Sequence, residues 1–135
     1  MHQVVVGILI RDGKVLVCHR RRGSRYELQW EFPGGKLEIG EPIHQTLERE
    51  LREELGVTGV RLEKSYTMTT SYSDNSKFNV TFCFVRSFEG TPMNKAFEAI
   101  RWVTPSELRG LDMLEGNKPF IDSLLHEVDR EQNRF

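Results

Sequence analysis

Three glutamates lie close together in the sequence: Glu53 and Glu54 follow Glu50 by three and four residues. In an α-helix this spacing places side chains on neighbouring positions, so the three carboxylates can converge. Like charges at this spacing cost about 0.2–0.5 kcal/mol per pair on an exposed helix, and part-burying an unpaired carboxylate costs more. A divalent cation that prefers hard oxygen ligands, such as Mg²⁺ or Mn²⁺, removes both penalties. Taken alone, these residues favour a solvated, salt-bridged helix surface, which charge runs usually form, and leave a metal site as the alternative; the surrounding sequence decides between the two.

The residues around these glutamates have the pattern of an amphipathic helix. Pro42 suits the first turn of such a helix, and Gly56 is the residue expected just past its end. Glu54 falls inside the apolar stripe and Glu50 just off one edge of it, which makes their burial costly without a metal. The stripe consists of four aliphatic residues that recur every fourth position: Ile43, Leu47, Leu51 and Leu55.

The remaining chain predicts strands on both sides of this helix. The pair Asp12-Gly13 tolerates the backbone of a tight hairpin turn between the first two strands. Shorter helices are predicted at 105–108 and 119–128. Strands are predicted at 4–10, 15–18, 60–62, 65–72, 78–86 and 97–104. We therefore expect one α/β domain over residues 1–128, with a mixed β-sheet flanked by helices, and a charged tail over 129–135.

The composition of the chain limits the classes of partner that it is expected to bind. The chain has 135 residues and a formal net charge of -1, so it lacks the basic excess that binds a nucleic-acid polymer. The apolar run from Val4 to Ile10 is too short to span a bilayer, so no membrane is expected as a partner. A small anionic substrate bridged by a cation remains compatible with this charge. Cys18 and Cys83 lie in apolar runs and are expected to be reduced core residues, with a disulfide as the alternative. Because the first residues show no secretory leader, we expect a cytoplasmic protein.

The segment from Gly35 to Val57 resembles the Nudix box, which is Gly, five residues, Glu, seven residues, Arg-Glu, an aliphatic, any residue, Glu-Glu, any residue, Gly and an aliphatic. Gly35, Glu41 and the run Arg49-Glu50-Leu51-Arg52-Glu53-Glu54-Leu55-Gly56-Val57 match every fixed position. The run Trp30-Glu31-Phe32-Pro33-Gly34-Gly35-Lys36 further resembles the MutT-like branch. This resemblance implies the Nudix α/β/α sandwich and Mg²⁺-dependent hydrolysis of a phosphoanhydride bond in a nucleotide, with Mn²⁺ as a substitute.

The resemblance also implies ligands for the metal. In such enzymes the glutamates at the positions of Glu50, Glu53 and Glu54 coordinate divalent cations, and the carbonyl of the glycine at the position of Gly34 commonly joins them. Arg49 would orient the carboxylates or contact phosphate.

Other residues that the resemblance assigns lie around this set. Lys36 would reach phosphate, and Glu41 would support the metal cluster. Glu53 is the first candidate for the general base that accepts a proton from the attacking water. Glu98 is the second candidate, because MutT-like proteins often keep an acidic residue near this position; its alternative is a solvent-facing glutamate on an edge strand.

Three residues match positions that contact the nucleotide in the MutT branch. Asn117 would read the edge of a purine with its amide, with a helix N-cap as the alternative. Phe32 would stack on a base and Arg20 would contact base or sugar. Their alternatives are a core aromatic and a surface cation.

We therefore expect a pyrophosphohydrolase that converts a nucleoside triphosphate to the monophosphate and pyrophosphate, with 8-oxo-dGTP as preferred substrate. Hydrolysis of CTP or methyl-dCTP is the alternative within the family, and a non-catalytic nucleotide-binding module is the alternative outside it. The segment 67–77 departs from the MutT pattern and is expected to border the base site. The expected oligomeric state is a monomer or weak homodimer.

Overall fold

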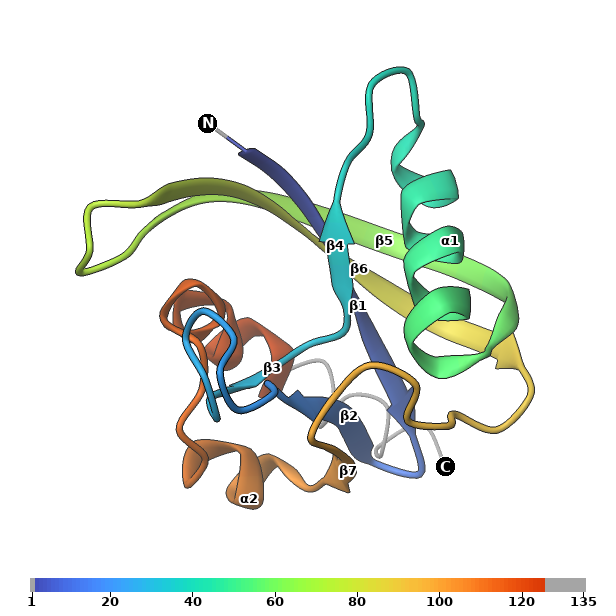
Figure 1. Ribbon diagram of the computed structural model, residues 1–135. Coiled ribbons are helices and arrows are strands. Elements are labelled where there is room, and N and C mark those ends of the chain that lie inside the picture. The colour runs from blue at the N-terminus through green and yellow to red at the C-terminus, as the bar shows by residue number, and fades with distance from the viewer. Residues whose placement is uncertain (1, 126–135) are drawn as a thin grey trace.

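The computed structural model describes residues 2–125 (Figure 1). The elements follow one another as β1 (His2–Arg11), β2 (Lys14–His19), β3 (Trp30–Glu31), β4 (Gly34–Lys36), α1 (Ile43–Leu55), β5 (Thr58–Ser71), β6 (Lys77–Glu89), β7 (Ala99–Val103), α2 (Pro105–Arg109) and the 3-10 helix η1 (Glu115–Phe120). Residues 121–125 continue as helix. The tail predicted over 129–135 lies outside the described residues.

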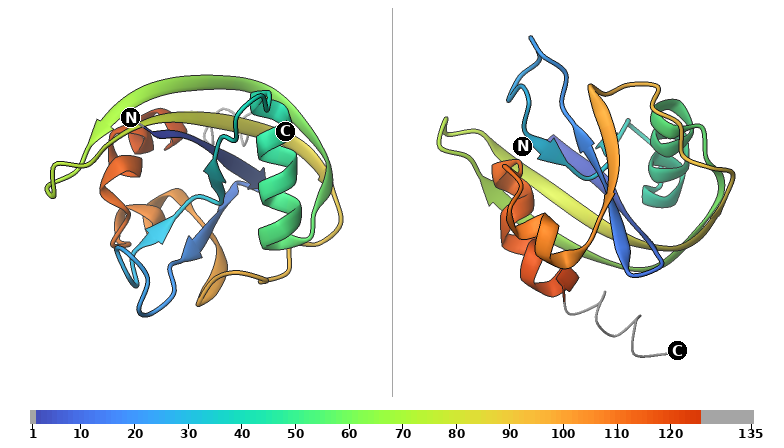
Figure 2. Two further views of the ribbon diagram at one scale, coloured as in Figure 1. Left: turned by 45° about the horizontal axis from the view of Figure 1, so that its top comes forward. Right: turned by 90° about the horizontal axis from the view of Figure 1, so that it is seen from below.

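The strands form the predicted mixed sheet. Strand β1 pairs in parallel with β6 and antiparallel with β2 and β4. Strand β5 pairs antiparallel with β6, whereas β3 and β7 pair antiparallel with β2. The main path through the sheet is therefore β3-β2-β1-β6-β5, and Figure 2 shows its strong twist.

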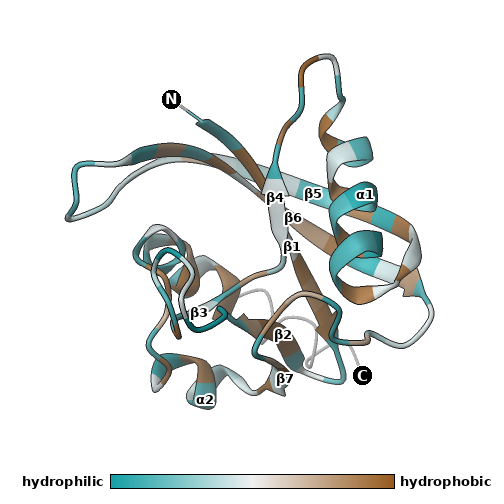
Figure 3. Ribbon diagram, viewed as in Figure 1, coloured by the Kyte–Doolittle hydropathy of each residue, from teal (hydrophilic) through white to brown (hydrophobic). Residues whose placement is uncertain are grey.

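Two apolar cores lie on opposite faces of this sheet, because successive side chains of a strand point to opposite faces. On β1, Val5 and Leu9 pack in the core that includes α1, whereas Val6 and Ile8 pack in the core that includes η1 and Leu124. Figure 3 shows the hydrophobic strands between the helices and the hydrophilic outer side of α1. Helices thus cover both faces, which confirms the α/β/α sandwich.

Helix α1 spans the segment in which the sequence predicts a helix. Leu47, Leu51 and Leu55 of its apolar stripe are fully buried, whereas Ile43 is 40% exposed and does not join the core. Pro42 is the N-cap residue rather than part of the first turn, and Gly56 ends the helix in the left-handed conformation with φ 71°. The helix contacts β1, β4 and β5, so its glutamates are held beside β4.

Other predictions from the sequence differ from the structure in their boundaries. Asp12 and Gly13 form the predicted turn, with φ of 55° and 74°. The strands predicted at 60–62 and 65–72 are one strand, β5, whose pairing with β6 shifts register between Thr58 and Lys64. Such irregularities absorb extra residues without ending a strand. The helix predicted at 119–128 is preceded by η1, and residues 126–128 lie outside the described part.

Cys18 and Cys83 are both buried and form no disulfide, as predicted. No helix within residues 2–125 is long and apolar enough to cross a membrane.

Candidate active site

Two glycines of β4 let this strand lie close to both β1 and α1. A Cβ on Gly34 would lie 2.1 Å from the carbonyl oxygen of Val5 on β1. A Cβ on Gly35 would lie 2.4 Å from the Cδ atom of Glu50 on α1. The lack of a side chain at Gly34 therefore lets β4 lie against β1, and its lack at Gly35 lets the Glu50 carboxylate lie directly over the strand.

Arg49 organises the carboxylates at the start of this site. Its Nε and Nη2 atoms donate to the two carboxylate oxygens of Glu41 at 2.7 and 2.9 Å, and its Nη1 donates to Glu50 at 2.9 Å. The same Nη1 lies 3.6 Å from a carboxylate oxygen of Glu53. These contacts, with a hydrogen bond from Thr46, lower the pKa of Glu41 to about 2. Arg49 therefore orients carboxylates in this structure, and Glu41 holds Arg49 in place.

Glu54 is the carboxylate whose charge is least compensated. One of its oxygens accepts a hydrogen bond from the backbone N–H of Gly34 at 2.9 Å. Burial, and then the nearby carboxylates of Glu50 and Glu31, nevertheless raise its pKa to about 9. Burial likewise raises the pKa of Glu50, although Arg49 opposes the shift. Near neutral pH the positive charges of the protein alone therefore do not keep Glu54 ionised.

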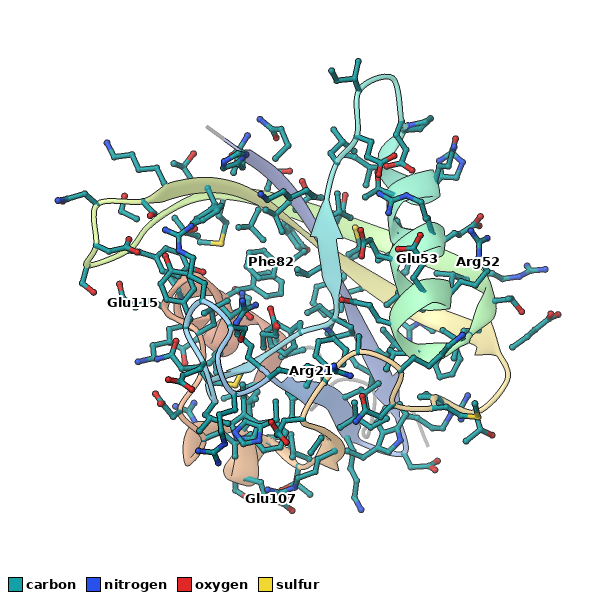
Figure 4. The ribbon with its side chains drawn as sticks, in the orientation of Figure 1. Arg21, Arg52, Glu53, Phe82, Glu107 and Glu115 are labelled. Carbon is teal, nitrogen blue, oxygen red and sulfur yellow. The ribbon has the colours of Figure 1, made fainter. Side chains whose placement is uncertain are left out.

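The three glutamates offer hard oxygen ligands that suit a divalent cation, but the structure does not gather them at one point. Among residues 2–125 no group of three His, Cys, Asp or Glu side chains is arranged to hold a metal ion. Glu50 binds Arg49 and Glu54 binds the backbone of Gly34, whereas the side chain of Glu53 is 56% exposed. Figure 4 shows Glu53 on α1. The donor chemistry and the uncompensated burial fit such an ion; binding it requires these side chains to turn toward one another.

A cavity of about 290 Å³ reaches the two glycines of β4, although none of the three glutamates lines it. Its apolar wall comes from β1 and β6, through Val4, Val6 and Val80. Gly34 and Gly35 line the side that leads to α1, so the same short strand borders both the cavity and the carboxylates. A bound molecule can therefore occupy the cavity and extend along β4 to the glutamates.

Asn117 lines this cavity and is 3% exposed. It lies within η1, so it is not the N-cap of a helix. Its Oδ1 atom accepts a hydrogen bond of 3.2 Å from the backbone N–H of Phe32. Because a backbone N–H can only donate, this contact fixes the orientation of the amide. The Nδ2 group then remains as a donor, and no described residue accepts from it.

The structure does not support the predicted stacking of Phe32 on a base. The Phe32 side chain is 1% exposed and packs in the core on the η1 side of the sheet, and it does not line the cavity. Phe32 contributes its backbone N–H instead, which binds Asn117. The alternative interpretation from the sequence, a core aromatic, is the one that the structure supports.

Arg20 and Lys36 line the cavity, as expected for residues that contact substrate. Arg20 donates to Glu31 at 2.9 Å and to the carbonyl oxygen of Arg25 at 2.7 Å, so part of its hydrogen-bonding capacity is already used. Glu98 is exposed just before β7 and does not line the cavity. Its carboxylate accepts from the backbone N–H of Arg22 at 3.2 Å.

Sequence reasoning missed several residues that line the cavity. Glu31 and Arg25 join Arg20 on one side, and the aromatic rings of Tyr26, Tyr72 and Phe78 line the cavity as well. Tyr72 belongs to the segment that was expected to border the base site. The sequence of this segment gave no further signal, because the residues that it meets in the cavity are far away along the chain.

Comparisons with known proteins agree on one family. Residues 1–124 match the NUDIX domain. A CTP pyrophosphohydrolase of Escherichia coli is 32% identical over 125 residues, which cover 93% of this chain and 92% of that protein. An 8-oxo-dGTP diphosphatase of Escherichia coli is 29% identical over 123 residues, which cover 90% of this chain and 95% of that protein.

A solved structure gives the same result for the fold. The solution structure of the E. coli ORF135 protein superposes with a TM-score of 0.81 at 30% sequence identity. The superposition covers 93% of this chain and 89% of that chain.

Proposed function

The chain belongs to the NUDIX family and is a nucleotide hydrolase, and we propose that it is an Mg²⁺-dependent nucleoside triphosphate pyrophosphohydrolase that prefers 8-oxo-dGTP. The products would be the nucleoside monophosphate and pyrophosphate. Removal of oxidised purine nucleotides from the cytoplasmic pool would be its role. The substrate is a small molecule rather than a nucleic-acid polymer, and the protein acts as a monomer or weak homodimer.

One observation carries this proposal: β4 borders the acidic face of α1 on one side and the cavity with Asn117 on the other. A nucleotide has one end that is a polyanion and another that is a planar base with specific hydrogen-bonding groups. The acidic face of α1 would bind the polyanionic end through a cation, and the cavity with Asn117 would hold the base. Lys36, at the end of β4, supplies positive charge where the phosphates would pass.

The carboxylates of α1 would carry the chemistry. Glu50, Glu53, Glu54 and the carbonyl of Gly34 would hold the divalent cation, Mg²⁺ or Mn²⁺, which neutralises phosphate charge and lowers the pKa of a bound water. Glu53 would accept the proton of the attacking water as general base, since its exposed carboxylate is the least engaged of the three. Glu98 is the second candidate for this role.

The fixed orientation of Asn117 supports a keto group as the group that is read. Its Nδ2 atom can only donate, so it matches the O6 acceptor of guanine or the O4 acceptor of thymine. Adenine and cytosine present an amino donor at the corresponding position, and two donors cannot pair. Since Oδ1 is already bound by Phe32, the contact expected from Asn117 is a single donor rather than a bidentate pair. This supports a guanine nucleotide, oxidised or not, over a cytosine nucleotide.

The experiment is a panel of triphosphates assayed with Mg²⁺, containing 8-oxo-dGTP, dGTP, dATP, dCTP, CTP and 5-methyl-dCTP. We expect monophosphate and pyrophosphate as products, with the highest kcat/KM for 8-oxo-dGTP. Equal or lower kcat/KM for that substrate contradicts the substrate assignment. Tight binding without turnover contradicts the hydrolase itself.

A cytosine triphosphate is the second candidate substrate, because a CTP pyrophosphohydrolase is among the similar proteins at 32% identity. The same panel separates the two candidates. Highest kcat/KM for CTP, dCTP or 5-methyl-dCTP would establish this second assignment and would require Asn117 to face another part of the nucleotide.

A further inference from the structure

Three segments that are distant in sequence meet around the base end of the cavity. They are residues 25–26 in the loop between β2 and β3, residues 72–76 in the turn between β5 and β6, and residues 115–117 in η1. Hydrogen bonds join the loop to the turn and the turn to η1. We call these three segments the clasp.

Tyr72 links the turn to η1 within this clasp. Its side chain lines the cavity and is 9% exposed. Its hydroxyl end packs directly against the backbone of Gly116. The two residues are so close that a Cβ on Gly116 would lie 2.4 Å from the hydroxyl oxygen. Tyr72 therefore holds the residue that immediately precedes Asn117.

A second contact ties the same two segments together. The carboxylate of Glu115 accepts from the backbone N–H of Ser73 at 2.8 Å and from its hydroxyl at 2.7 Å. Figure 4 shows Glu115 on the side of η1 near the β5–β6 turn. Consecutive residues of the turn thus bind consecutive residues of η1, which restricts rotation of the short 3-10 segment.

The loop supports Tyr72 from the other side. The Tyr26 hydroxyl donates to Asp74 at 2.6 Å, and Arg25 donates to the same carboxylate oxygen at 3.1 Å. The rings of Tyr26 and Tyr72 lie 5.0 Å apart between centroids, with 34° between their planes. Tyr72 is therefore held on its ring by Tyr26 and at its hydroxyl by Gly116.

We propose that Tyr72 is a positioning residue that sets base selectivity, because it fixes the amide of Asn117 through Gly116. This inference rests on the proposed function, in which Asn117 reads the base. Phe32 fixes one end of the Asn117 amide, and the clasp fixes the backbone that carries it. Loss of the Tyr72 hydroxyl would let the amide donor drift, and its hydrogen bond to a keto oxygen would weaken.

The test uses Tyr72→Phe, which removes one oxygen and keeps the ring. The matched control is Tyr66→Phe on β5, the strand that leads into the turn, because Tyr66 is 48% exposed and does not line the cavity. For each protein, kcat and KM are measured with 8-oxo-dGTP and with dCTP. The binding of 8-oxo-dGMP and dCMP is measured by calorimetry.

We expect Tyr72→Phe to reduce the selectivity for 8-oxo-dGTP over dCTP by about three- to tenfold, the range for weakening the one hydrogen bond between Asn117 and the base. The loss would appear mainly in KM and in monophosphate binding. Tyr66→Phe would leave the selectivity unchanged. Glu115→Ala would reduce it in the same direction, and the double variant would lose less than the two single losses combined, because both contacts hold one segment.

A folded Tyr72→Phe protein with unchanged selectivity would overturn the proposal. An equal loss for both nucleotides would also overturn it, because that is the result of a purely structural defect. Failure of the proposed function is distinguishable: the wild-type protein would then hydrolyse no triphosphate, while the calorimetric comparison of the two monophosphates would still report on Tyr72.

Discussion

Glu54 and Glu41 show how differently one residue type behaves within a single site. Burial and nearby carboxylates raise the pKa of Glu54 to about 9, whereas Arg49 lowers that of Glu41 to about 2. The sequence predicted the first environment, since Glu54 falls inside the apolar stripe of a helix. The sequence could not decide between a Phe32 ring that stacks on a base and one that packs in the core, because an aromatic side chain suits both. In the structure the ring is buried, and the backbone N–H of Phe32 binds Asn117.

Glu53 is the residue expected to act as general base. We predict that Glu53→Gln lowers kcat by about two to four powers of ten, the range expected for losing a general base. The fold should be retained, because the side chain is more than half exposed. Circular dichroism and steady-state kinetics check this. The control is Glu48→Gln on the exposed side of the same helix, which should keep the wild-type rate; a near-normal rate for Glu53→Gln would show that another group is the base.

Asn117 is the residue expected to choose the base. In Asn117→Asp the oxygen near Phe32 can still accept its hydrogen bond, while the amide donor is replaced by an acceptor. We predict that the preference for guanine-type over cytosine-type substrates falls at least about tenfold, the effect of one lost base contact. Competition assays with 8-oxo-dGTP and dCTP measure it. Retention of the wild-type preference would mean that Asn117 does not contact the base.

Elements with a strong periodic pattern were predicted well, and those set by tertiary contacts were not. The stripe of α1 identified the helix and Gly56 its end, because both are local signals. Strand β5 was predicted as two pieces, since the irregular pairing near Lys64 interrupts its alternation without breaking its hydrogen bonding to β6. The 3-10 helix η1 was not predicted; its contacts with Phe32, Tyr72 and Ser73 come from elsewhere in the chain.

Strand β4 must lack a side chain where it passes under Glu50. We predict that Gly35→Ala lowers activity and raises the Mg²⁺ concentration needed for half-maximal rate by about 10–100-fold, the effect expected for displaced metal ligands. The backbone at Gly35 lies outside the left-handed region, so the clash with Glu50 is the main effect. Gly110→Ala is the control, because its Cβ would make an ordinary contact at 3.6 Å. Equal metal dependence in both variants would contradict the role of β4.

Glu41, in the connection between β4 and α1, should make the free energy of unfolding depend on pH in the acidic range. Because the pKa of Glu41 is lowered in the folded protein, its stabilising contribution is present above the unfolded value near 4.5 and is lost as pH falls toward 2. We predict that wild-type protein is more stable than Glu41→Gln at pH 6 and that this difference shrinks by pH 3. Urea unfolding at both pH values measures it. A difference that is independent of pH would show that the ion pair with Arg49 does not contribute.

The α/β/α sandwich holds the proposed metal site on one side of β4 and the proposed base site on the other. One core fixes α1 and its carboxylates, while the opposite core fixes η1 and with it Asn117. The residues proposed for the first site could be named from the sequence, because they lie within one local pattern. The base cavity is built from the loop after β2, the β5–β6 turn and η1, whose proximity is a property of the folded chain alone.

The central claim is that a divalent cation stabilises the mutually repelling carboxylates of α1. Calorimetric titration of the metal-free protein with Mg²⁺ and Mn²⁺, compared with Glu54→Gln, tests it most directly. We predict saturable binding to the wild-type protein, a higher Tm with metal, and a large loss of both effects in the variant. Absence of binding, together with turnover that continues unchanged in the presence of a chelator, would contradict the account.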